Sequence, residues 1–324
     1  NDVRAVMQDD QNNYWVSTKD GVLRLFDSKM APLGYMTQSG AISTTGQPLD
    51  GVCYALMQDI NGTIWIGTKG KGLYKAQRVA GSPKNYKINR FVSNPDDIYS
   101  LSNDNIYYLH EDGKGRIWVA TYGGGLNYID NKNSDKLQFI NHRNNLKGYP
   151  INACSKVRYI SSGPSDNLLV GTTNGLVVFN NDFVDPENIS FKQYAFTPGD
   201  KSCLSNNDVH SIIVTKKREI YVATFGGGLN KMTLPANNDK PTFKAYTTYD
   251  GLPSDVLLSI LEDREGQLWL STENGLSKFD PATDHFENYD ERNFGAKVLF
   301  SESTAMADNN GSLWFGTDMG IVLF

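Results

Sequence analysis

The sequence predicts an all-β fold, a seven-bladed β-propeller of four-stranded antiparallel blades that spans residues 1–324. Two observations carry this prediction. One sequence unit recurs seven times along the chain, and its segments are rich in β-branched and aromatic residues that are interrupted by Gly and Asn. A helical solenoid of similar period would instead need apolar residues at helical spacing. Repeated four-stranded sheets of this kind close radially as the blades of a propeller.

The repeated unit is clearest in its second copy, DINGTIWIGTKGKGLYK, from Asp59 to Lys75. A threonine near its centre recurs in every copy, with successive gaps of 50, 53, 51, 52, 48 and 45 residues: Thr18, Thr68, Thr121, Thr172, Thr224, Thr272 and Thr317. Such a period accommodates four short strands and their turns. Copies four and five lack the Asp-x-x-Gly turn, and they carry Leu169 and Tyr221 where the other copies have Trp.

All five tryptophans occupy one slot of the second strand, namely Trp15, Trp65, Trp118, Trp269 and Trp314. The residue two places on shares a face with this slot. It is always small: Ser17, Gly67, Ala120, Gly171, Ala223, Ser271 and Gly316. A large ring beside a small neighbour suits stacked sheets, because the small residue leaves room for the adjoining blade. We therefore predict that the tryptophans are core residues and not a ligand platform.

Each copy divides into a first strand before the Asp-x-x-Gly turn, a second strand with the Trp slot, a third strand after the Gly-Leu turn, and a fourth strand. Examples of the first strand are 3–8 and 106–111, and examples of the fourth are 86–92, 137–142, 191–196, 243–249 and 285–289. The sequence holds seven first, second and third strands but six fourth strands. We expect the outer strand of the seventh blade to come from sequence outside this chain or to be missing.

Composition excludes several classes of protein. The net charge of −5 and the pI near 5.4 argue against a general nucleic-acid surface, which needs a basic excess. No apolar run approaches the roughly 20 residues of a membrane span. Cys53, Cys154 and Cys203 show no metal-ligand spacing and are an odd number, so we expect buried free thiols. No motif for a cofactor or a metal ion is present.

The unit Asp-x-x-Gly-x-[Leu/Ile]-Trp-[Ile/Val]-[Gly/Ala/Ser]-Thr-x-x-Gly-Leu resembles the two-component regulator propeller repeat. The resemblance covers essentially the whole chain, with departures in copies four and five. It implies one propeller of a larger periplasmic sensor in a hybrid two-component system of Bacteroidetes. Such a sensor detects oligosaccharide and signals across the inner membrane to a histidine kinase. The resemblance also implies neighbouring sensor domains and dimeric signalling as partners, with any membrane segment outside this chain.

A ligand is expected on the face where second-to-third turns and fourth-to-first loops emerge together, since variable loops on a rigid scaffold tend to carry binding. The candidates directly follow repeat threonines: Lys19, Lys69, Tyr122, Phe225, Glu273 and Asp318. Tyr122 and Phe225 are candidates for stacking on sugar rings, and Lys19 and Lys69 for meeting carboxylate or sulfate groups. Two alternatives stay open. These residues shape turns or pack on the next blade, or the face docks a neighbouring domain.

No catalytic residue is predicted. A glycosidase needs two carboxylates across a cleft, whereas most acids here lie in repeat turns, where a carboxylate caps turn amides. The four histidines, His110, His142, His210 and His285, do not cluster in the sequence. His110 and His210 fall in first strands, which line the central channel of a propeller, so a pairing in space stays open. A polysaccharide-active enzyme and a pure interaction scaffold are the alternatives to the sensor.

Overall fold

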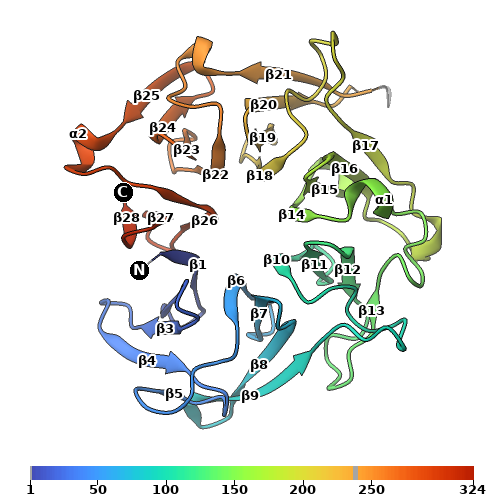
Figure 1. Cartoon of the computed structure of the whole chain (residues 1–324), viewed down its shortest axis with the longest axis vertical. Coiled ribbons are helices and arrows are strands. Elements are labelled where there is room, and N and C mark those ends of the chain that lie inside the picture. Colours follow the sequence, from blue (N-terminus) through green and yellow to red (C-terminus); the bar gives the residue numbers. More distant parts are fainter. Residues whose placement is uncertain (1, 236–239) are drawn as a thin grey trace.

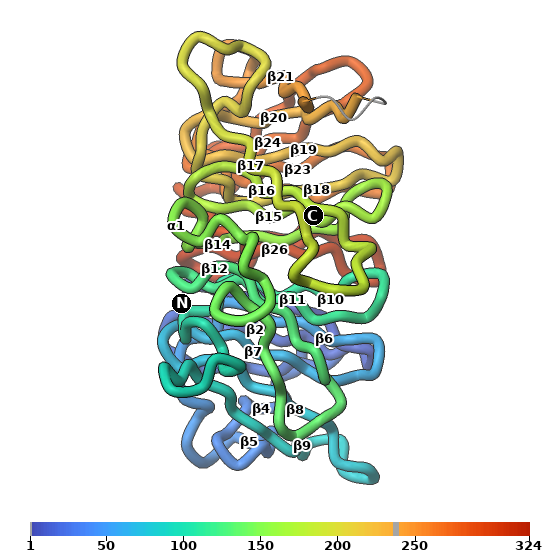
Figure 2. The backbone as a smooth tube through the Cα atoms, turned by 90° about the vertical axis from the view of Figure 1, so that its right-hand side faces the viewer, coloured from blue at the N-terminus to red at the C-terminus, as the bar shows by residue number. Residues whose placement is uncertain are grey.

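The computed structural model describes residues 2–235 and 240–324. In this part of the chain, seven antiparallel sheets surround a central channel, as Figure 1 shows in a view down the channel. Figure 2 shows the same ring edge-on, with the blades following one another in chain order. The predicted seven-bladed propeller is therefore confirmed. No helix in the described residues is long and apolar enough to cross a membrane.

The strands of each blade run outward from the channel in chain order. The innermost strands are β1 (Val3–Gln8), β6 (Val52–Gln58), β10 (Ile106–Glu111), β14 (Val157–Ser162), β18 (Val209–Val214), β22 (Leu257–Glu262) and β26 (Phe300–Ala307). The second strands are β2 (Tyr14–Thr18), β7 (Ile64–Lys69), β11 (Ile117–Thr121), β15 (Asn167–Thr172), β19 (Ile220–Thr224), β23 (Leu268–Thr272) and β27 (Leu313–Thr317). The third strands are β3 (Leu23–Phe26), β8 (Leu73–Val79), β12 (Gly125–Ile129), β16 (Gly175–Asn180), β20 (Gly228–Thr233), β24 (Gly275–Asp280) and β28 (Ile321–Leu323).

Outer strands complete six blades: β4 (Pro32–Met36), β9 (Ser82–Phe91), β13 (Phe139–Ile140), β17 (Lys192–Tyr194), β21 (Thr242–Tyr246) and β25 (His285–Tyr289). The seventh sheet has three strands among the described residues, as the strand count predicted. The first sheet has a fifth strand, β5 (Ile42–Ser43), which lies in the connection between β4 and β6 and was not among the predicted strands. This segment also bonds to blade 2, because Tyr86 N donates to Gly40 O at 2.8 Å.

Helical structure is confined to connections. Two helices of four residues each, α1 (Ile151–Cys154) and α2 (Glu291–Phe294), lie between blades. Single 3₁₀ turns span Pro164–Asp166, Pro186–Asn188 and Thr248–Asp250. The three cysteines are buried free thiols, as predicted.

The aspartate of the repeat turn links the turn to the tryptophan. In blade 2, Asp59 Oδ1 accepts the amides of Asn61 and Thr63, and Oδ2 accepts Trp65 Nε1 at 2.9 Å. The same Asp–Trp bond, at 2.8–3.0 Å, joins Trp15 to Asp9, Trp118 to Asp112, Trp269 to Asp263 and Trp314 to Asp308. The tryptophans are buried, which confirms the predicted core role. The sequence pattern predicted the turn cap but not the bond to the indole.

The threonine and the small residue have separate tasks. The threonine closes the second-to-third hairpin, as in blade 3, where Thr121 Oγ1 donates to Gly125 O at 2.7 Å. The small residue meets the first strand of the next blade: a Cβ atom at Gly67 would collide with Ile106, and one at Gly171 would lie 2.7 Å from Val209 Cγ1. The repeat thus specifies both the hairpin and the distance between blades, including in blade 4, which lacks the Trp.

Candidate functional site

The second-to-third turns and the fourth-to-first loops lie on one face of the ring, which we call the upper face. Tyr122 N donates to Asn105 O, and Phe225 N donates to Asp208 O, both at 2.8 Å. Each of these bonds ties the residue after a repeat threonine to the loop that leads into a first strand. The Asp-x-x-Gly turns lie at the other end of the strands, on the lower face. The prediction about which loops share a face is therefore confirmed.

A bulge in the innermost strands shapes the channel mouth on the upper face. In blade 1, Val3 pairs with Thr18 and Ala5 with Ser17, so Arg4 has no opposite residue. The equivalent extra residues of blades 2 to 6 are Tyr54, Tyr107, Arg158, His210 and Leu258. A bulge re-aims the side chain of the extra residue. The bulge residues at the channel mouth therefore differ in type from blade to blade.

Blade 7 has a wider irregularity that reaches across the channel. Residues 301–304 of β26 face Gly316 alone, and Ser303 has φ +50°. Glu302 forms an ion pair with Arg158 of blade 4, with 3.1 Å between Oε2 and Nη1. Ser303 Oγ donates to the His210 carbonyl of blade 5 at 3.0 Å. This segment of β26 therefore links blade 7 to blades 4 and 5 below the mouth.

A cavity of about 300 Å³ opens beside this crossing segment. It brings together three predicted residues, Phe225, Glu273 and Asp318, from blades 5, 6 and 7. Its apolar wall consists of Val256, Leu258, Leu299 and Phe300, and its remaining polar residues are Asp2, Arg4, Ser301 and Glu302. We call this cavity the mouth pocket. An aromatic ring beside several carboxylates is an arrangement that can stack on a sugar and accept hydrogen bonds from its hydroxyl groups.

Phe225 is the aromatic surface of the mouth pocket. Its side chain is 43% exposed, and one ring face stacks on His210 with 5.0 Å between centroids. His210 is almost fully buried, and its Nε2 lies 3.6 Å from Asp208 Oδ1. Asp208 also accepts hydrogen bonds from Arg158 at 2.7 and 3.1 Å. These contacts fix the orientation of the Phe225 ring from below.

Electrostatic pairing stabilises the floor of the mouth. Burial opposes the charge of Arg158, but the hydrogen bonds and the charge of Asp208, with Glu302, raise its pKa above the ordinary value. Burial likewise favours a neutral Asp208, yet the nearby His210 ring and the hydrogen bonds from Arg158 lower its pKa. Both groups therefore stay charged in the folded protein. Arg158 and Glu302 were not predicted, and His210 was predicted only to line the channel, because the bulges that aim Arg158 and His210 have no signature in the repeat.

The other three predicted residues lie outside the mouth pocket. Lys19 is 71% exposed, and its Nζ lies 3.8 Å from Asp2 Oδ2. Lys69 Nζ lies 5.8 Å from the ring centre of Tyr54. Tyr122 stacks on Tyr107 with 4.7 Å between centroids, and Lys156 and Arg158 also approach its ring. The ring of Tyr122 is thus occupied by packing within the protein, which favours the structural interpretation for this residue.

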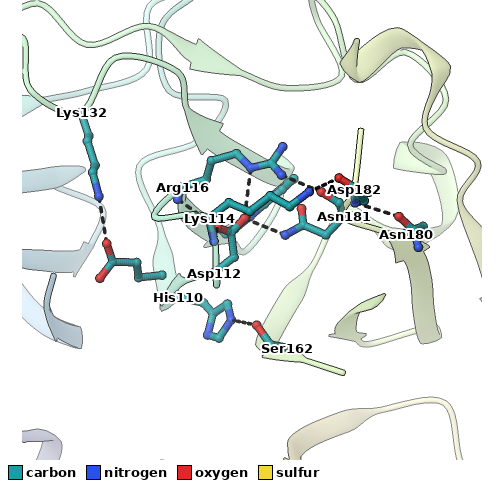
Figure 3. Close-up of polar contacts among 11 residues, drawn as sticks. His110, Asp112, Lys114, Arg116, Lys132, Ser162, Asn180, Asn181 and Asp182 are labelled. Carbon is teal, nitrogen blue, oxygen red and sulfur yellow. Dashed lines mark hydrogen bonds and ion pairs between the residues drawn. The ribbon is translucent and has the colours of Figure 1, made fainter. Parts of the chain in front are cut away.

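The two channel histidines are not brought together. His110 lies near the lower end of β10, where its Nε2 is 2.7 Å from Ser162 Oγ (Figure 3), whereas His210 lies near the upper end of β18. Burial lowers the pKa of His110 to about 4, so its ring is neutral and weakly basic near pH 7. A general base is most effective when its pKa lies near the working pH. The His110–Ser162 contact is therefore poorly suited to activate a nucleophile.

The described residues hold no group of three or more His, Cys, Asp and Glu side chains arranged to bind a metal ion. The aspartates of the repeat turns are engaged with turn amides and indoles. Asp112, for example, accepts from Lys114 N, Arg116 N, Trp118 and Asn181. These bonds outweigh the effect of burial and lower the pKa of Asp112.

Comparison with known proteins identifies the repeat. Residues 47–70, 100–123 and 251–274 match the family described as two component regulator propeller. Histidine kinase P4 of Formosa agariphila is 28% identical to the chain over 242 residues, which are 74% of the chain and 17% of that kinase. The chain thus spans less than a fifth of the length of this curated relative.

Two solved structures give the structural context. The extracellular domain of a putative hybrid two component system from B. thetaiotaomicron is 21% identical, with 99% of this chain and 45% of that chain covered and a TM-score of 0.49. Virginiamycin B lyase from Staphylococcus aureus is 13% identical, with 99% and 94% covered and a TM-score of 0.64. The latter shares the propeller fold, and at this identity the likeness extends to the fold alone. Three of the seven observed blades, the second, third and sixth, thus contain a match to the two-component regulator propeller family.

Proposed function

We propose that this chain is one propeller of the extracytoplasmic sensor part of a hybrid two-component system. In this role its mouth pocket contributes to the detection of an oligosaccharide. The proposal is supported by the repeat family and by the similarity to a histidine kinase. It places the propeller in the periplasm, next to further sensor domains of the same polypeptide, with the kinase supplied by segments outside this chain. The propeller itself is proposed to be non-enzymatic.

The single observation that carries the ligand proposal is the convergence of Phe225, Glu273 and Asp318 on one cavity. Phe225 offers an exposed ring, and Leu258 and Leu299 extend the apolar surface beside it. Glu273 and Asp318 form no ion pair with a cation among the described residues, so their oxygens are available to hydroxyl groups. Asp318 Oδ1 accepts the Leu299 amide at 3.3 Å, which orients its carboxylate.

Isothermal titration calorimetry with a panel of purified oligosaccharides tests this proposal. We expect saturable binding of at least one of them. The Phe225→Ala variant should weaken it by about tenfold or more, since an aromatic contact contributes on the order of 1–2 kcal/mol. Phe196→Ala is the matched control, because Phe196 is 47% exposed and lies outside the mouth pocket.

The outcomes separate the alternative functions. Binding that Phe196→Ala weakens as much as Phe225→Ala contradicts the mouth pocket as the site. Release of cleaved products from the panel would instead support a polysaccharide-active enzyme. No binding to any oligosaccharide, together with complex formation with the neighbouring sensor domain, would support an interaction scaffold.

A further inference from the structure

A cavity larger than the mouth pocket lies away from the mouth, at the interface between blades 4 and 5. It has a volume of about 850 Å³, against about 300 Å³ for the mouth pocket. Blade 4 supplies residues of its repeat turn and of strands β16 and β17, and blade 5 supplies residues of β20 and of the turn before β19. Nothing in the repeat or in the proposed sensing role assigns this cavity a function. We call it the interface pocket.

The neighbouring interface between blades 3 and 4 shows what normally fills this place. Figure 3 shows Lys114 and Arg116 of blade 3 extending to Asn181 and Asp182 of blade 4. Arg116 Nη2 donates to Asn181 O at 2.6 Å, Lys114 forms an ion pair with Asp182, and Asn181 Nδ2 donates to Asp112 at 2.7 Å. Long cationic side chains and the Trp118 ring thus close this interface.

The same positions in blade 4 carry shorter side chains. Leu169 replaces the Trp, and it is fully buried in its slot. Counting back from this slot, Asn167 stands where blade 3 has Arg116, and Ser165 stands where blade 3 has Lys114. Both Asn167 and Ser165 line the interface pocket. The loss of the Trp and of the two cations therefore accounts for the open volume.

The lining of the interface pocket combines an apolar floor with a basic rim. Val178, Ile220 and Met232 form the floor, and each is less than 7% exposed. Lys192, Arg218 and Lys231 lie on the rim together with Glu219. Glu219 pairs with Lys231, with 2.5 Å between Oε1 and Nζ. Within residues 2–235 and 240–324, Lys192 and Arg218 form no ion pair with a carboxylate.

We propose that the interface pocket binds a small organic anion with an apolar body. The apolar part packs on Val178, Ile220 and Met232, and the anionic group lies between Lys192 and Arg218. Two unpaired cations beside buried apolar side chains favour such a ligand over a neutral or cationic one, because a cation would meet like charge at the rim. The chain has a net charge of −5, so a basic rim is a local feature and not the general character of the surface. This site is independent of the mouth pocket and of the oligosaccharide proposed there.

Calorimetric titration with naphthalene-1-sulfonate, and with 1-naphthylmethylamine as its cationic counterpart, tests the proposal on the intact chain. We expect saturable binding of the sulfonate at one site and no comparable binding of the amine. The double variant Lys192→Glu with Arg218→Glu should weaken sulfonate binding about tenfold, since it replaces two favourable charge contacts with repulsive ones. The matched control is Lys201→Glu with Lys217→Glu, because both of these lysines are exposed and neither lines the interface pocket.

A steric variant provides a second readout. Ser190 is exposed and lines the interface pocket, so Ser190→Trp should block the sulfonate while leaving the circular dichroism spectrum and the melting temperature unchanged. Phe225→Ala, in the mouth pocket, should leave sulfonate binding intact, which separates this proposal from the proposed function. Absence of saturable sulfonate binding, equal binding of the amine, or an equal loss in the two double variants would each overturn the proposal.

Discussion

The interfaces on the two sides of blade 4 use the same positions of the repeat and differ in outcome. Between blades 3 and 4, Asp112, Arg116 and Trp118 form a closed network with Asn181 (Figure 3). Between blades 4 and 5 the equivalent positions carry no Asp–Trp pair, and a cavity of about 850 Å³ is present. Blades 4 and 5 nevertheless approach each other closely near the channel, because Gly171 of blade 4 lies against Val209 of blade 5.

The comparison separates two parts of the repeat. The threonine and the small residue are present in all seven blades, where they close a hairpin and set the approach of the next blade. The Asp–Trp pair is present in five blades, where it seals the lower part of the interface. A blade can therefore lose the seal and still belong to the ring, and the opened space becomes available for another use.

The largest effect on stability is expected from removing the aspartate of an Asp–Trp pair. Asp112→Ala leaves the Trp118 indole, the Asn181 amide and turn amides without an acceptor, and this should destabilise the protein by about 3 kcal/mol. Thr215 occupies the equivalent position in blade 5 and accepts one turn amide, from Glu219 at 3.1 Å. Thr215→Ala should cost only about 1 kcal/mol. Urea denaturation of both variants measures the difference. Equal losses of stability would show that the Asp–Trp pair adds no more stability to blade 3 than Thr215 adds to blade 5.

Enlarging the small residue should affect intact and degenerate blades alike. Gly67→Val and Gly171→Val each push a side chain into the first strand of the next blade, and we expect each to cost about 2 kcal/mol through overpacking. Thermal or urea unfolding is the measurement. A harmless Gly171→Val would show that the interface between blades 4 and 5 is loose as well as unsealed.

The sealed interface should also be sensitive to acid. The pKa of His110 is lowered from 6.5 to about 4 by burial, while Asp112 and Glu111 act in the opposite direction. The unfolded chain therefore takes up the proton first, so the stability from this residue is complete above pH 6.5 and is lost as the pH falls towards 4. Because the ring is only partly shielded, we expect a loss of about 1–2 kcal/mol. Urea unfolding at pH 7 and pH 5 should show a smaller difference for His110→Gln, whereas His285→Gln, at an exposed histidine, should behave as the native chain.

The smallest effect on stability is expected in blade 7, whose sheet has three strands among the described residues. β28 is the outer strand of a three-stranded sheet, and Leu323 on it is 56% exposed. Leu323→Lys should change the free energy of unfolding by less than about 0.5 kcal/mol. It should reduce self-association, because a charged residue discourages pairing at an open sheet edge. Sedimentation velocity at increasing protein concentration measures this, and unchanged association would mean that the edge does not pair.

The sequence predicted the ring well, because the repeat encodes it. Seven threonines and seven small residues gave the blade number, and the Trp slot gave the core. Outer strands were predicted less accurately. For example, a strand was predicted over 137–142 where β13 covers only Phe139–Ile140, and no strand was predicted at β5. Outer strands lie near the surface and lack a repeated motif, so their ends depend on tertiary contacts.

The candidate site was predicted in part. The rule that residues after the repeat threonines share one face identified Phe225, Glu273 and Asp318, which the structure brings to one cavity. It also selected Tyr122, whose ring is occupied by Tyr107. The rule did not find Glu302 or Ser303, because the irregular part of β26 breaks the repeat and crosses the channel. Which turn residues meet at a mouth depends on such bulges, and a periodic pattern does not encode them.

Hydrogen exchange measured with and without a bound oligosaccharide tests the central claim most directly, because it locates the ligand on the ring. If the ligand binds in the mouth pocket, exchange should slow in the turns around Phe225, Glu273 and Asp318 and in the pocket-lining residues 299–302, with blades 2 and 3 unchanged. Protection confined to the Tyr54–Tyr107–Tyr122 side of the mouth, or to the lower face near His110, would contradict it.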